Sequence, residues 1–271
     1  MGCPIAEFIP GSEISVSSLA GSVVAIDALN EIYRAATAIP GVELGYLNVI
    51  PTCVKKFALA GVRQIWVFDA APPALKAATL AARKSAPVRV RVTAEMINKV
   101  RELLMYAGIT CYIAPDGHDA EQICALLNIA GTVDHVVTTD GDAFLYGAKS
   151  VIKHRNRLMY QYKSADFATV HPRLVDNATG AVLPGLVKLG VVLGTDFAVK
   201  TPGVGPKTVF KKLDSIELTA DQKAAVQQFA QDRELISRCK VTTGPRNLGE
   251  VASRLGKDAF SLRIYETLAN I

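Results

Sequence analysis

Long apolar runs are missing from this 271-residue sequence, and none approaches the roughly 20 residues that a membrane-spanning helix needs. The first residues, MGCPIA, lack the basic-then-apolar pattern of a signal peptide, and Ala6 stands where myristoylation requires Ser or Thr. Cysteine is scarce: there are five, an odd number, and none forms a CxxC pair. A disulfide scaffold or zinc ribbon is therefore not expected. We expect an intracellular protein without a membrane partner.

The composition favours a folded chain with a basic surface. Half of the residues are hydrophobic and 20% are charged, which supports a sizeable core and excludes wholesale disorder. The net charge is only +5, but cations concentrate in three acid-free stretches: between Asp69 and Glu95, between Asp142 and Asp166, and between Asp196 and Asp214. Such a stretch is commonly a solvated face, yet each of these begins at an aspartate. This pattern predicts a polyanion held beside carboxylates.

Short β-branched runs alternate with helical patterns, an order typical of an α/β fold with a central, mostly parallel sheet flanked by helices. The expected strands are 22–27, 63–69, 110–114, 135–140 and 150–153. The expected helices are 28–38, 46–60, 93–107, 119–130 and 142–147, and a glycine near the end of four of them favours a left-handed cap: Gly61, Gly108, Gly131 and Gly147. From residue 183 the pattern is helical without strands. We therefore expect a core over 1–182 and a helical subdomain over 183–271, in which 221–240 forms an amphipathic helix.

Six carboxylates stand at or just beyond the ends of predicted strands: Asp27, Asp69, Asp119, Glu121, Asp140 and Asp142. Parallel strands end at one edge of a sheet, where ligands bind, so these side chains are expected to gather. Asp140 and Asp142 are two residues apart, a spacing that in extended chain points both the same way. So many like charges would raise one another's pKa values unless divalent cations neutralise them, and Mg²⁺ is the usual cation beside phosphates.

A simpler explanation exists for each aspartate taken alone, which can close a turn or cap a helix. Asp119 could cap its helix, with Gln122 completing a pair like a capping box. The coincidence at four strand ends nevertheless favours a metal site. Two cations about 4 Å apart would serve phosphodiester hydrolysis, one activating water and the other stabilising the leaving oxygen.

Five segments form an ordered series along residues 20–212: AIDALNEIYRA, VFDAAPPALKAATLAARK, APDGHDAEQICALL, TTDGDAFLYGA and LGVVLGTDFAVKTPGVGPKTVFKKL. Together they resemble the flap endonuclease/XPG family of structure-specific 5′ nucleases, and LLNIAGTVDHVVTTDGDAFLYGA is most similar to its Holliday-junction-resolving branch. The resemblance implies a PIN-like nuclease core and a helix–two-turn–helix at about 186–213. It also implies cleavage of DNA with two Mg²⁺ ions, for which Mn²⁺ can substitute.

The resemblance assigns roles to individual residues. The metal ligands would be the six carboxylates and, on the resemblance alone, Asp196. Lys76 and Arg83, seven residues apart and so on one side of a helix, would act in catalysis by gripping the scissile phosphate and stabilising charge. Tyr33 would stack on the nucleotide beside the cleaved bond. Other DNA-binding positions would be Gly2, Lys84, Arg89, Arg91, Gly203, Gly205, Lys207, Lys211 and Lys212. A solvated helix face for the cations and a core position for Tyr33 are the alternatives.

The segment TPGVGPK over 201–207 would form the hairpin of the helix–two-turn–helix, which in the family carries a bound K⁺; a plain packing corner is the alternative. The sequence departs from the family in three places. Asp119 stands where the family usually has Glu, and Phe197 replaces the common Tyr. The stretch after Lys84 is too short for the paired helices of a full arch, so we expect a reduced arch around 76–94. No sliding-clamp motif of the QxxLxxFF kind is present.

We therefore expect a Mg²⁺-dependent, structure-specific DNA nuclease that acts in replication, repair or recombination and reads duplex shape and backbone rather than bases. A 5′ flap and a four-way junction are both open as substrates, and the latter would require two active sites, hence a monomer that can dimerise on DNA. Two alternatives are an inactive nucleic-acid-binding scaffold and an RNA-directed nuclease of the wider PIN-like group.

Overall fold

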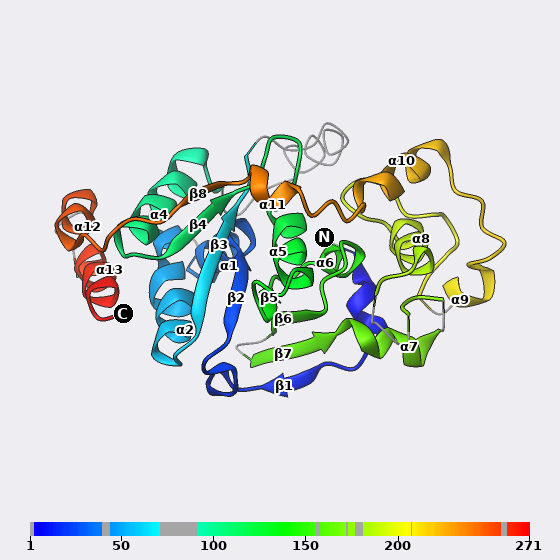
Figure 1. Cartoon of the computed structure of the whole chain (residues 1–271), viewed down its shortest axis with the longest axis horizontal. Coiled ribbons are helices and arrows are strands. Elements are labelled where there is room, and N and C mark those ends of the chain that lie inside the picture. Colours follow the sequence, from blue (N-terminus) through cyan, green and yellow to red (C-terminus); the bar gives the residue numbers. More distant parts are fainter. Residues whose placement is uncertain are drawn as a thin grey trace.

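The computed structural model describes residues 3–39, 44–70, 91–155, 158–171, 173–176, 181–206, 208–255 and 259–271. Within these ranges, eight strands form one sheet in the order β1-β7-β6-β5-β2-β3-β4-β8 (Figure 1). The five middle strands, from β6 to β4, run parallel to one another, whereas β7 and β8 join them antiparallel at the two sides and β1 pairs antiparallel with β7. The expected α/β sheet is confirmed.

All five predicted strands are present. The strands are β1 Ser12–Ile14, β2 Val23–Asp27, β3 Arg63–Phe68, β4 Thr110–Ile113, β5 His135–Val137, β6 Ser150–Arg155, β7 Leu158–Lys163 and β8 Lys240–Thr242. The expectation that no strand follows residue 183 is wrong, because β8 pairs with β4. A three-residue edge strand has too few positions to establish an alternating pattern, so its pairing comes from tertiary contacts.

The predicted helices before residue 148 are also present, although 46–60 divides into short turns at Gly45–Asn48 and Ile50–Val54 followed by α2. The helices are α1 Ala28–Ala38, α2 Lys55–Leu59, α4 Ala94–Tyr106, α5 Ala120–Ile129, α6 Asp142–Leu145, α7 Phe167–Val170, α8 Pro184–Leu193, α9 Val209–Lys212, α10 Ala220–Gln228, α11 Leu235–Arg238, α12 Leu248–Arg254 and α13 Ala259–Ala269. The four glycines predicted near helix ends all have positive φ. The single helix expected over 221–240 is wrong, since α10 ends at Gln228 and α11 is separate.

Hydrophobic side chains cover both faces of the sheet. Along β2, Ala25 packs into one core, while Val24 and Ile26 pack into the other, as the two-residue period of a strand requires. The first core contains nearly all of α5 and the inner face of α8. The second core contains Ile32 of α1 and Leu103 of α4. This burial on two faces brings the ends of β2, β3 and β5 to one edge.

The chain after residue 183 occupies both ends of the molecule. Helices α8, α9 and α10 lie at one end in Figure 1, while α12 and α13 lie at the other, beyond α4. Close packing joins α8 to the core, because a Cβ at Gly190 would lie 2.5 Å from the Leu145 side chain. No helix in the described part of the chain has the length and apolar character needed to cross a bilayer.

Candidate metal centre and nucleic-acid interface

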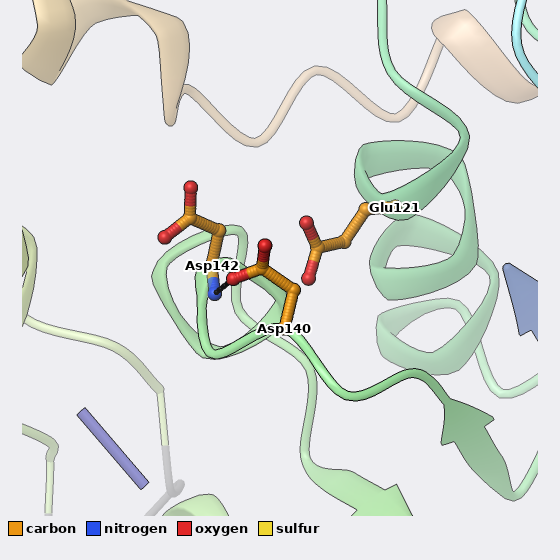
Figure 2. Close-up of side chains that lie close together, drawn as sticks. All are labelled: Glu121, Asp140 and Asp142. Atoms are coloured by element: carbon orange, nitrogen blue, oxygen red, sulfur yellow. Dashed lines mark hydrogen bonds between the residues drawn. The ribbon is translucent and has the colours of Figure 1, made fainter. Parts of the chain in front are cut away.

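Three carboxylates from separate elements meet beside the sheet. Glu121 lies in the first turn of α5, Asp140 follows β5, and Asp142 begins α6 (Figure 2). One oxygen from each lies within 4.8 Å of the others. Figure 2 shows Asp140 between the other two side chains. The structure thus brings together three of the seven predicted ligands in a group that a single cation could bridge.

Backbone amides hold these side chains in place. The Ala143 amide donates to Glu121 Oε1 at 2.8 Å, and the Asp142 amide donates to Asp140 Oδ1 at 3.0 Å. Because β5 already ends at Val137, the expectation of an extended chain through Asp140 is wrong. A turn, in which the Asp140 carboxylate accepts from the amide two residues later, brings the pair together instead.

Asp27 occupies the junction between β2 and α1. Its carboxylate caps the helix by accepting from the Asn30 amide at 3.2 Å, and it also accepts from the Thr138 hydroxyl at 3.2 Å. Burial, followed by the negative charges of Asp69 and Asp140, raises the pKa of Asp27 to about 7. This shift is what crowded carboxylates produce when no cation neutralises them.

The hydrogen bonds of Asp69 and Asp119 differ from the helix cap that the sequence suggested for Asp119. The cap of α5 comes from Asp69, whose Oδ1 accepts from the Ala120 amide at 2.7 Å. The side chain of Asp119 makes no cap and instead accepts from the Tyr146 hydroxyl at 3.1 Å. The capping alternative for Asp119 is therefore wrong. Burial, and then the charges of Asp119, Asp142 and Glu121, raise the pKa of Tyr146, which places Asp119 in the same electrostatic environment.

Asp196 is buried in the segment after α8. The adjacent Phe197 packs edge-on against Phe229, and Phe229 packs on Tyr146, with ring centroids 5.5 and 4.8 Å apart. An aromatic cluster therefore connects this segment to the side chain that binds Asp119. Asp27, Asp69, Asp119 and Asp196 are not members of the three-carboxylate group, and their role as ligands stays a prediction.

Lys153 of β6 is a charged neighbour of the cluster that the sequence did not single out. The ammonium donates to the Thr139 carbonyl at 3.0 Å, one residue before Asp140. Burial lowers the pKa of Lys153, while Asp140 and Glu121 are the strongest influences in the opposite direction. The sequence placed this lysine in an acid-free basic stretch, and only the pairing of β5 with β6 brings its strand beside the loop that carries Asp140.

A second candidate site lies at the predicted hairpin. Residues 200–205 line a cavity of about 310 Å³. Gly203 has a φ of +71°, which supports a tight turn. The buried Gln222 of α10 donates to the Val199 carbonyl at 3.3 Å and to the Thr201 hydroxyl at 2.9 Å. The hairpin is thereby held against α10, with Lys211 and Lys212 exposed in the last turn of α9.

The remaining predicted residues divide into exposed positions and positions outside the described ranges. Tyr33 on α1 is 38% exposed, so a core position for this ring is wrong and its face is accessible. Arg91 is also exposed. The residues outside the described ranges are Gly2, Lys76, Arg83, Lys84, Arg89 and Lys207. The predicted arch over 76–94 falls there for the most part.

The donor set of the cluster fits a hard divalent cation. Its three members offer carboxylate oxygens, which Mg²⁺ and Mn²⁺ prefer. The nearby thiol of Cys124 is a poor rival, because burial and the surrounding carboxylates raise its pKa well above the ordinary value. All five cysteines are buried and unpaired by disulfides, as expected. The residues present are therefore suited to magnesium or manganese.

Sequence comparisons relate the chain to the XPG I-region and to proteins named flap endonuclease 1. Residues 108–196 match the family model described as XPG I-region. Flap endonuclease 1 of Methanothrix thermoacetophila is 26% identical over 287 aligned residues, covering 89% of this chain and 84% of that protein. Flap endonuclease 1 of Leishmania braziliensis is 28% identical, covering 73% of this chain, which spans only 59% of the relative's length.

Solved structures share the fold. Flap endonuclease-1 of Methanococcus jannaschii has a TM-score of 0.71 at 20% identity, covering 99% of this chain and 98% of that one. The catalytic core of Rad2 in complex with DNA substrate has a TM-score of 0.69 at 22% identity, covering 96% and 95%. Human GEN1 in complex with Holliday junction DNA has a TM-score of 0.65 at 20% identity, covering 95% and 74%.

Fold and acidic site together define the class: an α/β protein with a mixed sheet and carboxylates gathered beside the ends of parallel strands. Within that class, the chain is similar to flap endonuclease/XPG proteins in the matched XPG I-region, in sequence and in fold.

Proposed function

We propose that the protein is a divalent-metal-dependent, structure-specific DNA endonuclease that cuts phosphodiester bonds near boundaries between single and double strands. The observation that carries this proposal is the meeting of Glu121, Asp140 and Asp142 within 4.8 Å, next to an Asp27 whose pKa is raised by burial and by neighbouring carboxylates. A protein gains nothing in stability from such crowding unless cations offset the repulsion. The names of the relatives, flap endonuclease 1, support the same activity.

The three clustered carboxylates would hold the cation, and Asp27, Asp69, Asp119 and Asp196 are proposed to complete a two-ion site. When bound, Mg²⁺ or Mn²⁺ would polarise the phosphate and lower the pKa of a water nucleophile. The protein's own residues would position the substrate. Tyr33, with its exposed ring, would stack on the base next to the cleaved bond, and Lys76 and Arg83 would contact the scissile phosphate.

The hairpin over 200–205 would hold the duplex arm, with K⁺ as a candidate ion in its cavity. Backbone amides at a glycine turn can approach phosphates closely, and the exposed Lys211 and Lys212 add positive charge beside it. The buried Gln222 fixes the hairpin to α10, so this surface is preformed. These contacts would read backbone and shape, not base sequence.

The preferred branched substrate is the finer question. The curated relatives named above are flap endonucleases, which favours a 5′ flap. The fold is also similar to that of human GEN1, solved with Holliday junction DNA, so a four-way junction is the second candidate. Cleavage of a four-way junction would need two copies of the chain. We propose a monomer in the absence of DNA.

A cleavage panel tests the proposal. Flap, gap, bubble and four-way junction DNA are incubated with the protein in Mg²⁺, in Mn²⁺ and in EDTA, alongside the Asp140→Asn variant and an RNA-substituted flap. We expect cleavage at the branch point of DNA only when a metal is present, with a loss of at least about 100-fold in Asp140→Asn. Binding of DNA by both proteins without any cleavage would favour the scaffold, and preferential cleavage of the RNA-substituted flap would favour an RNA-directed nuclease.

A further inference from the structure

A lysine of the neighbouring strand is hydrogen-bonded to the loop that carries part of the acidic cluster. Lys153 lies on β6, which pairs with β5, and its half-buried ammonium donates to the carbonyl of Thr139 at 3.0 Å. Thr139 immediately precedes Asp140, whose amide donates to the Thr138 hydroxyl at 3.2 Å. The ammonium is therefore fixed to the backbone of the loop that carries two of the clustered carboxylates.

The three carboxylates of this cluster are among the electrostatic neighbours of Lys153, together with the buried Cys3 thiol. Asp140, Glu121 and Asp142 each stabilise its charged form, in opposition to burial. A buried ammonium persists only when nearby negative charge compensates for lost hydration. Conversely, the carboxylates gain a cation that belongs to the chain and cannot dissociate.

The anchored position separates Lys153 from the lysines expected to bind DNA. Lys149, in the same basic stretch, is exposed, and its ammonium makes only a 3.5 Å contact with the Ile129 carbonyl. Lys211 and Lys212 are exposed at the far helix α9. A lysine that is half-buried and hydrogen-bonded to the loop has its charge directed at the carboxylates, so its effect should fall first on the metal.

We propose that Lys153 is an internal counter-ion of the metal centre, which holds the carboxylates together before metal binds and weakens the affinity for divalent cations by competing electrostatically. This inference rests on the proposed metal-dependent function. The neighbouring lysine makes metal binding reversible at a loop that would otherwise bind cations more tightly. It also supports the geometry of Asp140 in the metal-free protein. Lys153 is thus a positioning and affinity-setting residue, not one that contacts substrate.

The experiment measures Mn²⁺ binding and unfolding without DNA. Calorimetric titration with Mn²⁺ compares the wild type with Lys153→Gln, which removes the charge and retains a donor, and with Lys153→Arg, which retains the charge. Lys149→Gln is the matched control, since it removes an exposed lysine from the same stretch. Thermal unfolding of each protein is recorded in EDTA and in saturating Mn²⁺.

We expect Lys153→Gln to bind Mn²⁺ about tenfold more tightly than the wild type, with Lys153→Arg and Lys149→Gln close to the wild type. In EDTA, Lys153→Gln should unfold at a lower temperature than Lys149→Gln, and saturating Mn²⁺ should remove most of that difference. Unchanged or weaker Mn²⁺ binding by Lys153→Gln, or a loss of folding that Mn²⁺ does not restore, would overturn the inference. If the wild type binds no Mn²⁺ at all, the proposed metal-dependent function fails as well. If the wild type binds Mn²⁺ and Lys153→Gln binds it with the same affinity, only the counter-ion role of Lys153 is overturned.

Discussion

Individual side chains of the cluster serve the fold and the site at the same time. Asp27 caps α1, Asp69 caps α5, and Asp140 closes the turn that leads into α6. Each carboxylate therefore has one oxygen committed to a backbone amide. A carboxylate offers several lone pairs, so accepting one hydrogen bond leaves capacity for a cation. Capping and metal binding, which compete as explanations in the sequence, are compatible in the structure.

The raised pKa of Asp27 predicts that the metal-free protein loses stability as the pH rises. The folded-state pKa of about 7 exceeds the ordinary value of 3.8, so the folded protein favours protonated Asp27. This contribution is fully present below about pH 4 and is lost as the pH rises through about 7. In EDTA, denaturation of Asp27→Asn should show a gain of about 1–3 kcal/mol over the wild type at pH 8 and a smaller gain at pH 5.

Glu217→Gln, at an exposed position before α10, is the control and should follow the wild type at both pH values. Measurements of urea midpoints across pH 5 to 8 check the difference. A wild type as stable at pH 8 as at pH 5, in EDTA, would contradict the assignment of a strained carboxylate at Asp27. Saturating Mn²⁺ should reverse the order, because Asp27→Asn loses a proposed ligand.

At the scale of elements, what the sequence could predict depended on local signals. The β-branched runs predicted β2 to β6, and the glycine at 61 ends α2 with a positive φ, as expected. Pairings that join distant segments could not be predicted: β8 meets β4 across about 130 residues, and the Asp69 cap of α5 spans 51. The position of Lys153 could not be predicted for the same reason, since its hydrogen bond to Thr139 and its charged neighbours Asp140 and Glu121 come from distant segments. The site's acids were visible in the sequence, but their hydrogen bonds were not.

Two contacts between side chains hold α1 against the elements around the candidate metal centre. The Asn30 amide group donates to the Thr139 hydroxyl at 2.8 Å, which connects the first turn of α1 to the loop of Asp140. On the helix's buried side, Glu31 binds His154 at 3.1 Å and Arg34 at 2.9 Å. Burial alone raises the pKa of Glu31, but His154 and Arg34 lower it below its ordinary value. The helix that carries Asp27 and Tyr33 is therefore fixed on two sides.

A close contact with the N-terminal segment makes the loop of Asp140 sensitive to a larger side chain at Gly141. A Cβ at Gly141 would lie 2.1 Å from the carbonyl oxygen of Cys3, which precedes the short helix Pro4–Phe8. Because that obstacle is backbone, Gly141→Ala must displace the loop or the segment. We expect a loss of about 1–3 kcal/mol in unfolding free energy and weaker Mn²⁺ binding, since Asp140 and Asp142 flank the substituted residue.

Gly205→Ala provides the comparison, because a Cβ there meets no atom within 4 Å and its φ is not positive. Denaturation and Mn²⁺ titration of the two variants separate a local clash from a general effect of removing glycine. Equal stability and equal Mn²⁺ affinity in both variants would show that the Cys3 contact does not hold the loop.

At the scale of the whole molecule, the chain places its candidate surfaces apart. The candidate metal centre lies beside the middle of the sheet, the hairpin and α9 lie at one end, and β8 with α12 and α13 closes the other end (Figure 1). At that closed end, Arg254 pairs with Glu102 of α4, so its cations are partly engaged within the fold. Exposed cations at the hairpin end are therefore the better candidates for phosphate contacts.

This separation predicts that charge at α9 controls DNA binding without changing the metal centre. The double variant Lys211→Gln/Lys212→Gln removes two exposed cations next to the hairpin. Each lost phosphate contact lowers the slope of log affinity against log salt by about one, so the slope should fall by up to about two. Fluorescence anisotropy on flap DNA in EDTA, over a series of salt concentrations, measures that slope.

Lys99→Gln/Lys240→Gln, on α4 and β8 away from the hairpin, should keep the wild-type slope, and all three proteins should bind Mn²⁺ equally. An unchanged slope in the α9 variant would remove this end of the molecule from the DNA interface. Deleting a cation that contacts phosphate must reduce the number of counter-ions released on binding, and so must lower the slope.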